Sequence, residues 1–197
     1  MSTDVATKFW KRQAAYPFPF TRQRRIHELN YLVPRLQKLG GKRLLDLGCG
    51  DGALLECLVH LLDYDQYFGL DVAEGLLKGI SPRIMTAAYD LSAPTALPDV
   101  DVTILAGAIQ YVFDDSAMAR ALEYVTSPRL YVRSTCTLLP DDEEVLNDGY
   151  ASRYRTVPHT FELLSRRFVI AAIDRVYPDE IESKYGTKQF YFECVRR

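Results

Sequence analysis

The chain has 197 residues, of which 48% are hydrophobic and 25% charged, and its formal net charge is −2. This length suits a single domain over 1–197 that buries about 70% of its unfolded surface. Because no apolar run approaches the roughly 20 residues of a membrane span and the N-terminus shows no signal-peptide core, we expect a cytoplasmic protein without membrane contact. Four scattered cysteines and three histidines predict neither a metal site nor a disulfide framework.

The chain opens with an aromatic arm that leads into a helix. Residues 1–20 carry five aromatic side chains, are interrupted by Pro17 and Pro19, and need a surface to pack on. Apolar residues at helical spacing predict a helix over 22–39, which Pro34 should kink or restart. We interpret 1–42 as a candidate lid.

The first 43 residues are strongly basic. They hold ten Lys and Arg residues and two acidic residues, whereas the remainder of the chain is acidic. Two interpretations stay open. Either the basic arm packs on the acidic body of its own chain, or it forms an electropositive patch near a substrate mouth.

A strand, a glycine-rich turn and a helix follow one another over 44–62. Gly48, Gly50 and Gly52 stand at alternate positions directly after the strand, and a leucine-rich helical pattern follows them. This arrangement brings bare backbone against a nucleotide-like ligand at a helix N-terminus. The next strand, 66–71, ends at Asp71, whose carboxylate can accept hydrogen bonds from ribose hydroxyls.

Charge indicates which nucleotide-like ligand fits this turn. The spacing of Gly48, Gly50 and Ala53 also fits the dinucleotide fingerprint. However, Asp46 and Asp51 would face a pyrophosphate there, at a cost of about 1 kcal/mol per contact in water and more when buried. A cationic ligand without phosphate suits the turn better, and S-adenosylmethionine, with its sulfonium and ammonium groups, is such a ligand.

Strands and helices alternate through the rest of the chain. We expect strands at 83–87, 101–106, 130–134, 168–173 and 188–195, and helices at 73–78, 114–125 and 160–166. The alternation predicts a doubly wound α/β fold with a mostly parallel sheet. The last strand follows a loop instead of a helix, so it can pair antiparallel with its predecessor.

Asp46-x-Gly48-x-Gly50-x-Gly52 resembles the first motif of the class I S-adenosylmethionine-dependent methyltransferases. The resemblance continues at Asp71, at 89–91 and along the strand 101–106 with the residues after it. It implies a Rossmann-like, seven-stranded sheet with helices on both faces and an antiparallel edge strand. It also implies that the glycine turn lies under the methionine part of the cofactor, that Asp71 holds the ribose and that Asp90 faces the adenine amino group. On this basis we expect the cofactor at Asp46, Gly48, Cys49, Gly50, Asp51, Gly52, Asp71, Val72, Asp90, Leu91 and Ala106.

The methyl acceptor should lie beyond 106–111, because ligands of open parallel sheets bind outside the carboxyl ends of the strands. The aromatic arm and the polar stretch 135–158, which we interpret as a substrate-side insert, are placed to cover it. Positioning contributes more than a general base to such a transfer, so a dedicated base is not required. Candidate bases are His159 and Tyr111, and candidate acceptor-binding residues are Tyr16, Gln110, Arg153, Tyr154 and Arg155.

The sequence therefore predicts a methyltransferase that acts on a small polar metabolite. The insert, rich in Arg and Tyr, and the basic arm favour an anionic or sugar-bearing acceptor. We do not expect a nucleic acid as the acceptor. After the fourth strand the chain lacks the Asn/Asp-Pro-Pro-Tyr pattern of enzymes that methylate base amino groups. The alternatives are an RNA methyltransferase that uses the basic arm, an NAD-dependent oxidoreductase and a non-enzymatic binding module.

Overall fold

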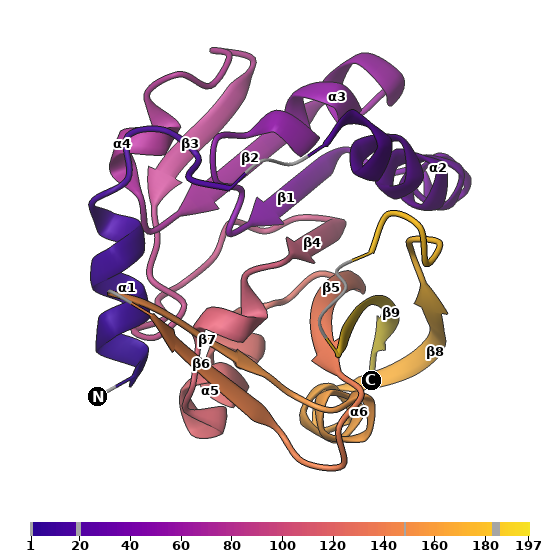
Figure 1. The fold of residues 1–197 in the computed structure, drawn as a ribbon. Helices are drawn as coiled ribbons and strands as arrows, with labels where there is room; N and C mark the ends of the chain where they lie inside the picture. Colours follow the sequence, from indigo (N-terminus) through magenta and orange to yellow (C-terminus); the bar gives the residue numbers. More distant parts are fainter. Residues whose placement is uncertain (1, 19–20, 148, 183–185) are drawn as a thin grey trace.

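A computed structural model describes residues 2–18, 21–147, 149–182 and 186–197, and it contains a seven-stranded sheet in the order β3-β2-β1-β4-β5-β9-β8 (Figure 1). The strands are β1 (Arg43–Leu47), β2 (Gln66–Asp71), β3 (Ile84–Ala88), β4 (Val102–Ala106), β5 (Arg129–Thr137), β8 (Phe168–Arg175) and β9 (Thr187–Arg196). The pairs from β3 through to β5 are all parallel, and β9 pairs antiparallel with both β5 and the edge strand β8. The doubly wound, mostly parallel Rossmann-like fold predicted from the sequence is confirmed, with the reversed strand placed between β5 and the edge.

Helices cover both faces of the sheet (Figure 1). On one face lie α2 (Arg22–Leu39) and α3 (Ala53–Leu61), and on the other lie α5 (Asp115–Tyr124) and α6 (Val157–Ser165). Side chains of a strand point alternately to the two faces, so Leu44 of β1 joins the α2–α3 core while Leu45 and Leu47 join the α5–α6 core. The same alternation turns Asp46 toward the α2–α3 face. Two short elements, α4 (Glu74–Leu77) and η1 (Ile109–Tyr111), follow β2 and β4.

The structure adds two elements to those expected from the sequence, and it shows one helix where the sequence suggested a kink or a restart. The aromatic arm contains a helix, α1 (Ser2–Lys11), whose Ala6 and Trp10 are buried one turn apart. The polar stretch 135–158 contains the end of β5 and a hairpin of β6 (Glu143–Asn147) and β7 (Tyr150–Tyr154), in which Glu144 lies opposite Arg153. The helix α2 runs through Pro34 as one element. Both missed elements are stabilised by contacts distant in sequence, since α1 packs against β7 and η1. Pro19 and Phe20 of the arm lie outside the described residues.

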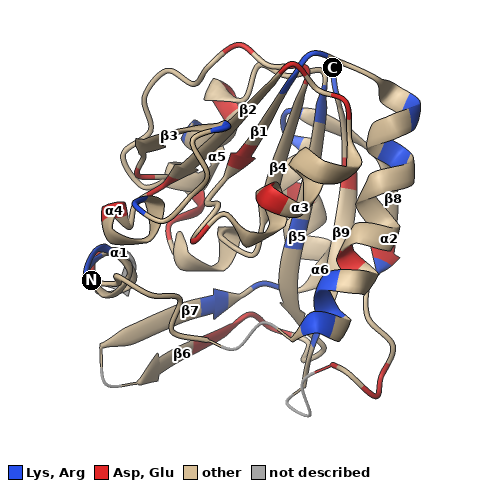
Figure 2. Cartoon of the chain, turned by 90° about the horizontal axis from the view of Figure 1, so that it is seen from above, with Lys and Arg blue, Asp and Glu red and all other residues tan. Residues whose placement is uncertain are grey.

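The basic N-terminal segment packs on the acidic body of its own chain. Lys11 pairs with Asp90 at 3.2 Å, Arg43 with Asp99 at 2.6 Å and Arg35 with Asp174 at 3.4 Å. Figure 2 shows basic and acidic residues interspersed around the molecule, for example along the neighbouring strands β6 and β7. These pairs support the self-packing interpretation for Lys11, Arg35 and Arg43.

A fully buried carboxylate ties α2 to the sheet. Glu28 of α2 is 0% exposed, and its Oε1 accepts hydrogen bonds from Arg133 of β5 at 2.8 Å and from the Tyr191 hydroxyl of β9 at 2.9 Å. Its Oε2 accepts from Arg25 at 2.8 Å. Such a fully bonded cluster fixes the position of α2, because a buried ion is tolerated only with all its partners in place.

Removing this carboxylate should therefore be costly. We expect Glu28→Ala to lower the free energy of unfolding by about 3–5 kcal/mol, since Arg133 loses its buried counter-ion. Asp99→Asn, which breaks the exposed pair with Arg43, should cost less than about 1 kcal/mol. Urea denaturation of the two variants measures both values. Equal losses would show that the Glu28 cluster does not anchor α2.

Candidate active site

The glycine turn after β1 is pressed between the ends of β2 and β4. Gly48 and Gly50 have φ angles of 81° and 58°, which strongly favour glycine. A Cβ on Gly48 would lie 2.5 Å from the Cβ of Ala108, in the loop after β4. The backbone N–H groups of Gly48 and Cys49 donate to the carbonyl of Leu70 at 2.6 and 3.0 Å. The turn thus exposes bare backbone at the carboxyl edge of the sheet, as the sequence predicts.

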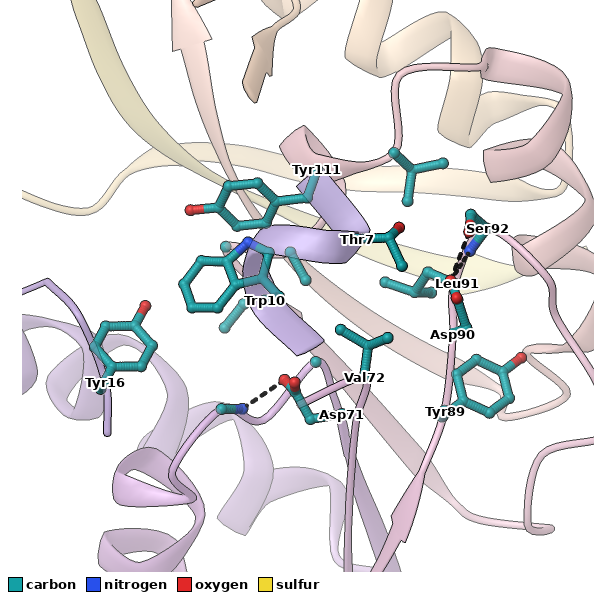
Figure 3. Close-up of a pocket in the computed structure, with 16 residues that line it drawn as sticks. Thr7, Trp10, Tyr16, Asp71, Val72, Tyr89, Asp90, Leu91, Ser92 and Tyr111 are labelled. Carbon is teal, nitrogen blue, oxygen red and sulfur yellow. Dashed lines mark hydrogen bonds between the residues drawn. The ribbon is translucent and has the colours of Figure 1, made fainter. Parts of the chain in front are cut away.

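Asp71 joins this turn to the end of β2. Its Oδ2 accepts a hydrogen bond from the Gly50 N–H at 2.8 Å (Figure 3), and its Oδ1 accepts one from the Ala73 N–H at 2.8 Å. Burial raises the pKa of Asp71, and the backbone N–H groups oppose that rise. Each carboxylate oxygen keeps acceptor capacity for a further donor.

A first hollow of about 640 Å³ opens beside Asp71 (Figure 3). Asp71, Val72, Asp90, Leu91 and Ala106 line it together, as expected for a nucleoside site, and Gly48 and Gly50 form part of its wall. Its other lining residues are Thr7, Trp10, Tyr16, Tyr89, Ser92, Gly107, Ala108, Tyr111 and Val112. Its mixed polar and apolar lining is typical of small-molecule sites.

Asp90 is held by neighbours inside this hollow. Its Oδ1 accepts hydrogen bonds from the Ser92 N–H at 2.9 Å and the Ser92 hydroxyl at 2.6 Å, and Lys11 approaches its Oδ2. Partial burial raises the pKa of Asp90, but the hydrogen bonds from Ser92 and Lys11 outweigh it and hold that pKa below its usual value. Asp90 is therefore ionised at neutral pH and can accept from an amino group.

A second hollow of about 1250 Å³ lies on the α2 side of the glycine turn. It shares Tyr16, Gly48, Gly50 and Ala106 with the first hollow, so the two adjoin across these residues. Its polar lining comprises Arg22, Arg25, Glu28, Asp46, Asp51 and Arg133, and it also includes Phe18, Cys49, Ala53, Leu54 and Cys57.

Asp46 is the distinctive group of the second hollow. It is 2% exposed, and its Oδ1 has no hydrogen-bond partner among the residues that the structure describes. Burial, together with the nearby carboxylate of Glu28, raises the pKa of Asp46 to about 7. A buried acceptor without a donor is costly, so the hollow is suited to a ligand that brings a donor or a positive charge.

Aromatic side chains close the outer side of the cleft. Trp10 packs edge-on against Tyr111 with ring centroids 4.9 Å apart, and Tyr16 lies 5.7 Å from Trp10. Phe18 and Tyr150 of the hairpin continue the cluster, at 5.3 Å from each other. Tyr16, which we expected at the acceptor, lies on the wall between the two hollows.

Tyr111 lines the first hollow but is poorly suited to act as a base. Burial raises the pKa of its phenol well above the usual value, and its hydroxyl lies 3.4 Å from that of Tyr150. The phenol is therefore neutral at physiological pH. It can donate a hydrogen bond or form a wall, whereas the basic role that we considered for it requires a phenolate.

The other sequence candidates lie apart from the two hollows. Both ring nitrogens of His159 are held by carboxylates, Nδ1 by Asp142 at 2.8 Å and Nε2 by Asp115 at 3.0 Å. Arg153 also pairs with Asp142, at 2.9 Å. The structure thus engages His159 and Arg153 in an ion-pair network instead of bringing them to the cleft.

Arg155 acts on the cleft indirectly. It is 2% exposed and donates to the carbonyls of Ile109 and Val112 at 3.2 and 2.7 Å, which anchors the turn that carries Tyr111. Gln110 is buried beside Tyr111, and Tyr154 belongs to the hairpin; neither lines a hollow. These residues hold the frame of the cleft.

Sequence reasoning missed the contributions of Thr7 and Trp10 to the first hollow and of Glu28 and Arg133 to the second. The helical spacing of Ala6 and Trp10 is a local signal for α1, but no local signal pairs Glu28 with Arg133. Within the described ranges, no group of three or more His, Cys, Asp or Glu side chains is arranged to hold a metal ion. No helix among them is long and apolar enough to cross a membrane.

Solved structures share this fold over most of the chain. A SAM-dependent methyltransferase from Leishmania major superposes with a TM-score of 0.77 at 14% identity, over 98% of this chain and 82% of that one. The 1,6-didemethyltoxoflavin-N1-methyltransferase of Burkholderia thailandensis, solved with bound S-adenosylhomocysteine, gives a TM-score of 0.65 at 16% identity over 89% of this chain and 77% of that one. These likenesses confirm the Rossmann-like methyltransferase fold.

Sequence similarity points to the same class. No family model matches the chain. It is 28% identical over 141 residues to an ubiquinone biosynthesis O-methyltransferase from Chromobacterium violaceum, a match that covers 70% of this chain and 55% of that relative. The chain thus spans about half the length of this curated relative. Together with the fold, this similarity confirms the resemblance to the class I S-adenosylmethionine-dependent methyltransferases.

The raised pKa of Asp46 predicts a pH-dependent stability. Because the folded protein holds the Asp46 proton up to about pH 7 and the unfolded chain only to about pH 4, the stability from the protonated carboxyl is complete below about pH 4 and is lost as the pH rises through 7. Between pH 6 and 8 the wild type should lose about 1.4 kcal/mol relative to Asp46→Asn. Urea denaturation of both proteins at the two pH values measures this difference, and parallel pH profiles would contradict it.

Proposed function

We propose that this protein is an enzyme that transfers the methyl group of S-adenosylmethionine to a small molecule and releases S-adenosylhomocysteine. The observation that carries the proposal is the buried, unpartnered carboxylate oxygen of Asp46 in the hollow beside the glycine turn. A carboxylate there attracts an ammonium or sulfonium ion. It would repel the pyrophosphate of a dinucleotide, and more strongly than in water because the site is buried.

The residues of the first hollow fit the adenosine half of that cofactor. Asp71 can accept hydrogen bonds from ribose hydroxyls, and the ionised Asp90 can accept one from the adenine amino group. Val72, Leu91 and Tyr89 offer apolar surface for the base. The methionine half would then cross the shared wall at Gly48 and Gly50 into the second hollow, where Asp46 lies.

The cofactor supplies an activated methyl group, and the chain supplies the positions of the two reactants. Transfer from sulfur to a nucleophilic atom is an in-line displacement, so holding donor and acceptor in line can contribute about 7–11 kcal/mol. Tyr16 lies on the wall between the hollows and excludes water from the transfer point. We infer that positioning carries the reaction, because the Tyr111 phenol is neutral and His159 lies apart from both hollows.

The proposed acceptor is a small polar metabolite with an anionic or sugar group. Arg22 and Arg25 line the second hollow, which supports an acidic group on the acceptor. The O-methyltransferase relative supports oxygen as the methyl-accepting atom. The RNA alternative loses its main support, because basic side chains of the N-terminal segment form ion pairs with acidic side chains elsewhere in the chain.

Comparison of two ligands tests the proposal. We expect S-adenosylhomocysteine, but not NADH, to raise the melting temperature of the wild-type protein. Asp71→Ala should weaken S-adenosylhomocysteine binding by about 1.5–3 kcal/mol, since a charged acceptor for ribose is lost. The exposed Asp65→Ala is the matched control and should leave the affinity unchanged. Calorimetry measures the affinities, and unchanged affinity in Asp71→Ala would refute the assignment.

Turnover separates the proposed enzyme from a binding module with the same fold. The wild type should transfer labelled methyl groups to at least one member of a panel of small hydroxylated acids. Retention of S-adenosylmethionine without transfer to any member of a broad metabolite panel would favour the binding module.

A further inference from the structure

The N-terminal residues 2–18, here called the strap, lie across three loops of the cleft. Tyr16 covers the glycine turn, since a Cβ on Gly50 would lie 3.2 Å from its Cε2 atom. Trp10 packs on Tyr111 after β4 (Figure 3), and Lys11 pairs with Asp90 after β3. The strap therefore touches the loops that build the first hollow and adds Thr7, Trp10 and Tyr16 to its wall.

The backbone of the strap packs directly against Gly75. Gly75 lies in α4, and a Cβ on it would overlap the backbone of Gln13 and Ala14. Gly79, four residues further along, has nothing within 4 Å of an added Cβ. A methyl group at the first position must displace the strap, whereas the same group at the second meets open space.

The strap is attached by contacts that can be broken without disturbing the sheet. Its Gln13 N–H donates to the Trp10 carbonyl and the Gln13 side chain to the Phe9 carbonyl, both within the strap. The Lys11–Asp90 pair is open to solvent, with side chains 53% and 24% exposed. Such an exposed pair contributes little by itself, so the packing of α1 on β7 and η1, the aromatic cluster and the contact with Gly75 provide most of the attachment.

Docking of the strap also buries a donor that the protein alone does not satisfy. Trp10 is 7% exposed, lines the first hollow, and its Nε1 has no hydrogen-bond partner among the described residues. A buried donor without a partner in the described chain is costly and disfavours the docked arrangement. A ligand that fills the hollow against Trp10 and Thr7 removes part of that cost.

From these contacts we propose that the strap is itself a part of the cofactor site, docked on Gly75 and Asp90, so that strap docking and cofactor binding stabilise each other. The inference rests on the proposed function, because it concerns the same cofactor. By linkage, whatever displaces the strap lowers cofactor affinity, and bound cofactor protects the strap. Release of S-adenosylhomocysteine then requires the strap to open.

The test uses Gly75→Ala, with Gly79→Ala as its matched control and S-adenosylhomocysteine as the probe. Alanine is a better helix former than glycine, so Gly75→Ala leaves α4 and the sheet folded. We expect it to weaken binding by about tenfold or more, and Gly79→Ala to stay within about twofold of the wild type. Lys11→Gln should weaken binding less, by under about fivefold, because its ion pair is exposed.

Limited trypsin digestion reports on the strap itself, which offers cleavage sites at Lys8, Lys11 and Arg12. S-adenosylhomocysteine should slow cleavage there in the wild type and in Gly79→Ala, but much less in Gly75→Ala. Equal affinity of the two glycine variants, or cleavage of the wild-type strap that the ligand does not slow, would overturn the role of the strap alone. Failure of the wild type to bind S-adenosylhomocysteine at all would overturn the proposed function as well.

Discussion

The carboxylate of Asp71 holds the glycine turn in place, and the cleft depends on this interaction. It accepts hydrogen bonds from the N–H of Gly50 after β1 and the N–H of Ala73 after β2, while the Leu70 carbonyl accepts one from the Gly48 N–H. The turn is thereby fixed close to Ala108 after β4, which leaves no room for a side chain at Gly48. Bare backbone then faces both hollows, and the walls on either side come from loops at the same edge of the sheet.

Three carboxylates around this turn differ in their hydrogen-bond partners. Glu28 is matched by Arg25, Arg133 and Tyr191, and Asp71 by backbone N–H groups, whereas the Oδ1 of Asp46 lacks a partner within the described chain. Glu28 and Asp71 thus have hydrogen-bond partners within the protein, whereas the Oδ1 of Asp46 can still accept a hydrogen bond from a ligand. This asymmetry links the buried polar cluster under α2 to the choice of a cationic cofactor over a dinucleotide.

The sequence predicts the parts of this structure that depend on local pattern. The strands 44–47, 66–71 and 101–106, the glycine turn and Asp71 follow from periodicity and position in a parallel sheet, and Asp90 follows from the family resemblance. The helix α1 and the β6–β7 hairpin escape prediction because each is stabilised by the other and by η1. His159 and Arg155 are residue types that often act in binding or catalysis. Here they pair with carboxylates and a carbonyl that are distant in sequence, and so they support the structure around the cleft. Sequence pattern reveals a side chain's chemistry, and only tertiary contacts decide which groups remain free for a ligand.

The central claim is that Asp46, once ionised, receives the positive charge of the ligand. Calorimetric titration of the wild-type protein with S-adenosylmethionine at pH 6 and pH 7.5 tests it most directly. Since burial raises the pKa of Asp46 to about 7, the affinity should rise by up to about tenfold between these pH values, with net proton release on binding. An affinity that falls or stays constant over this interval, or tighter binding of NADH, would contradict the account.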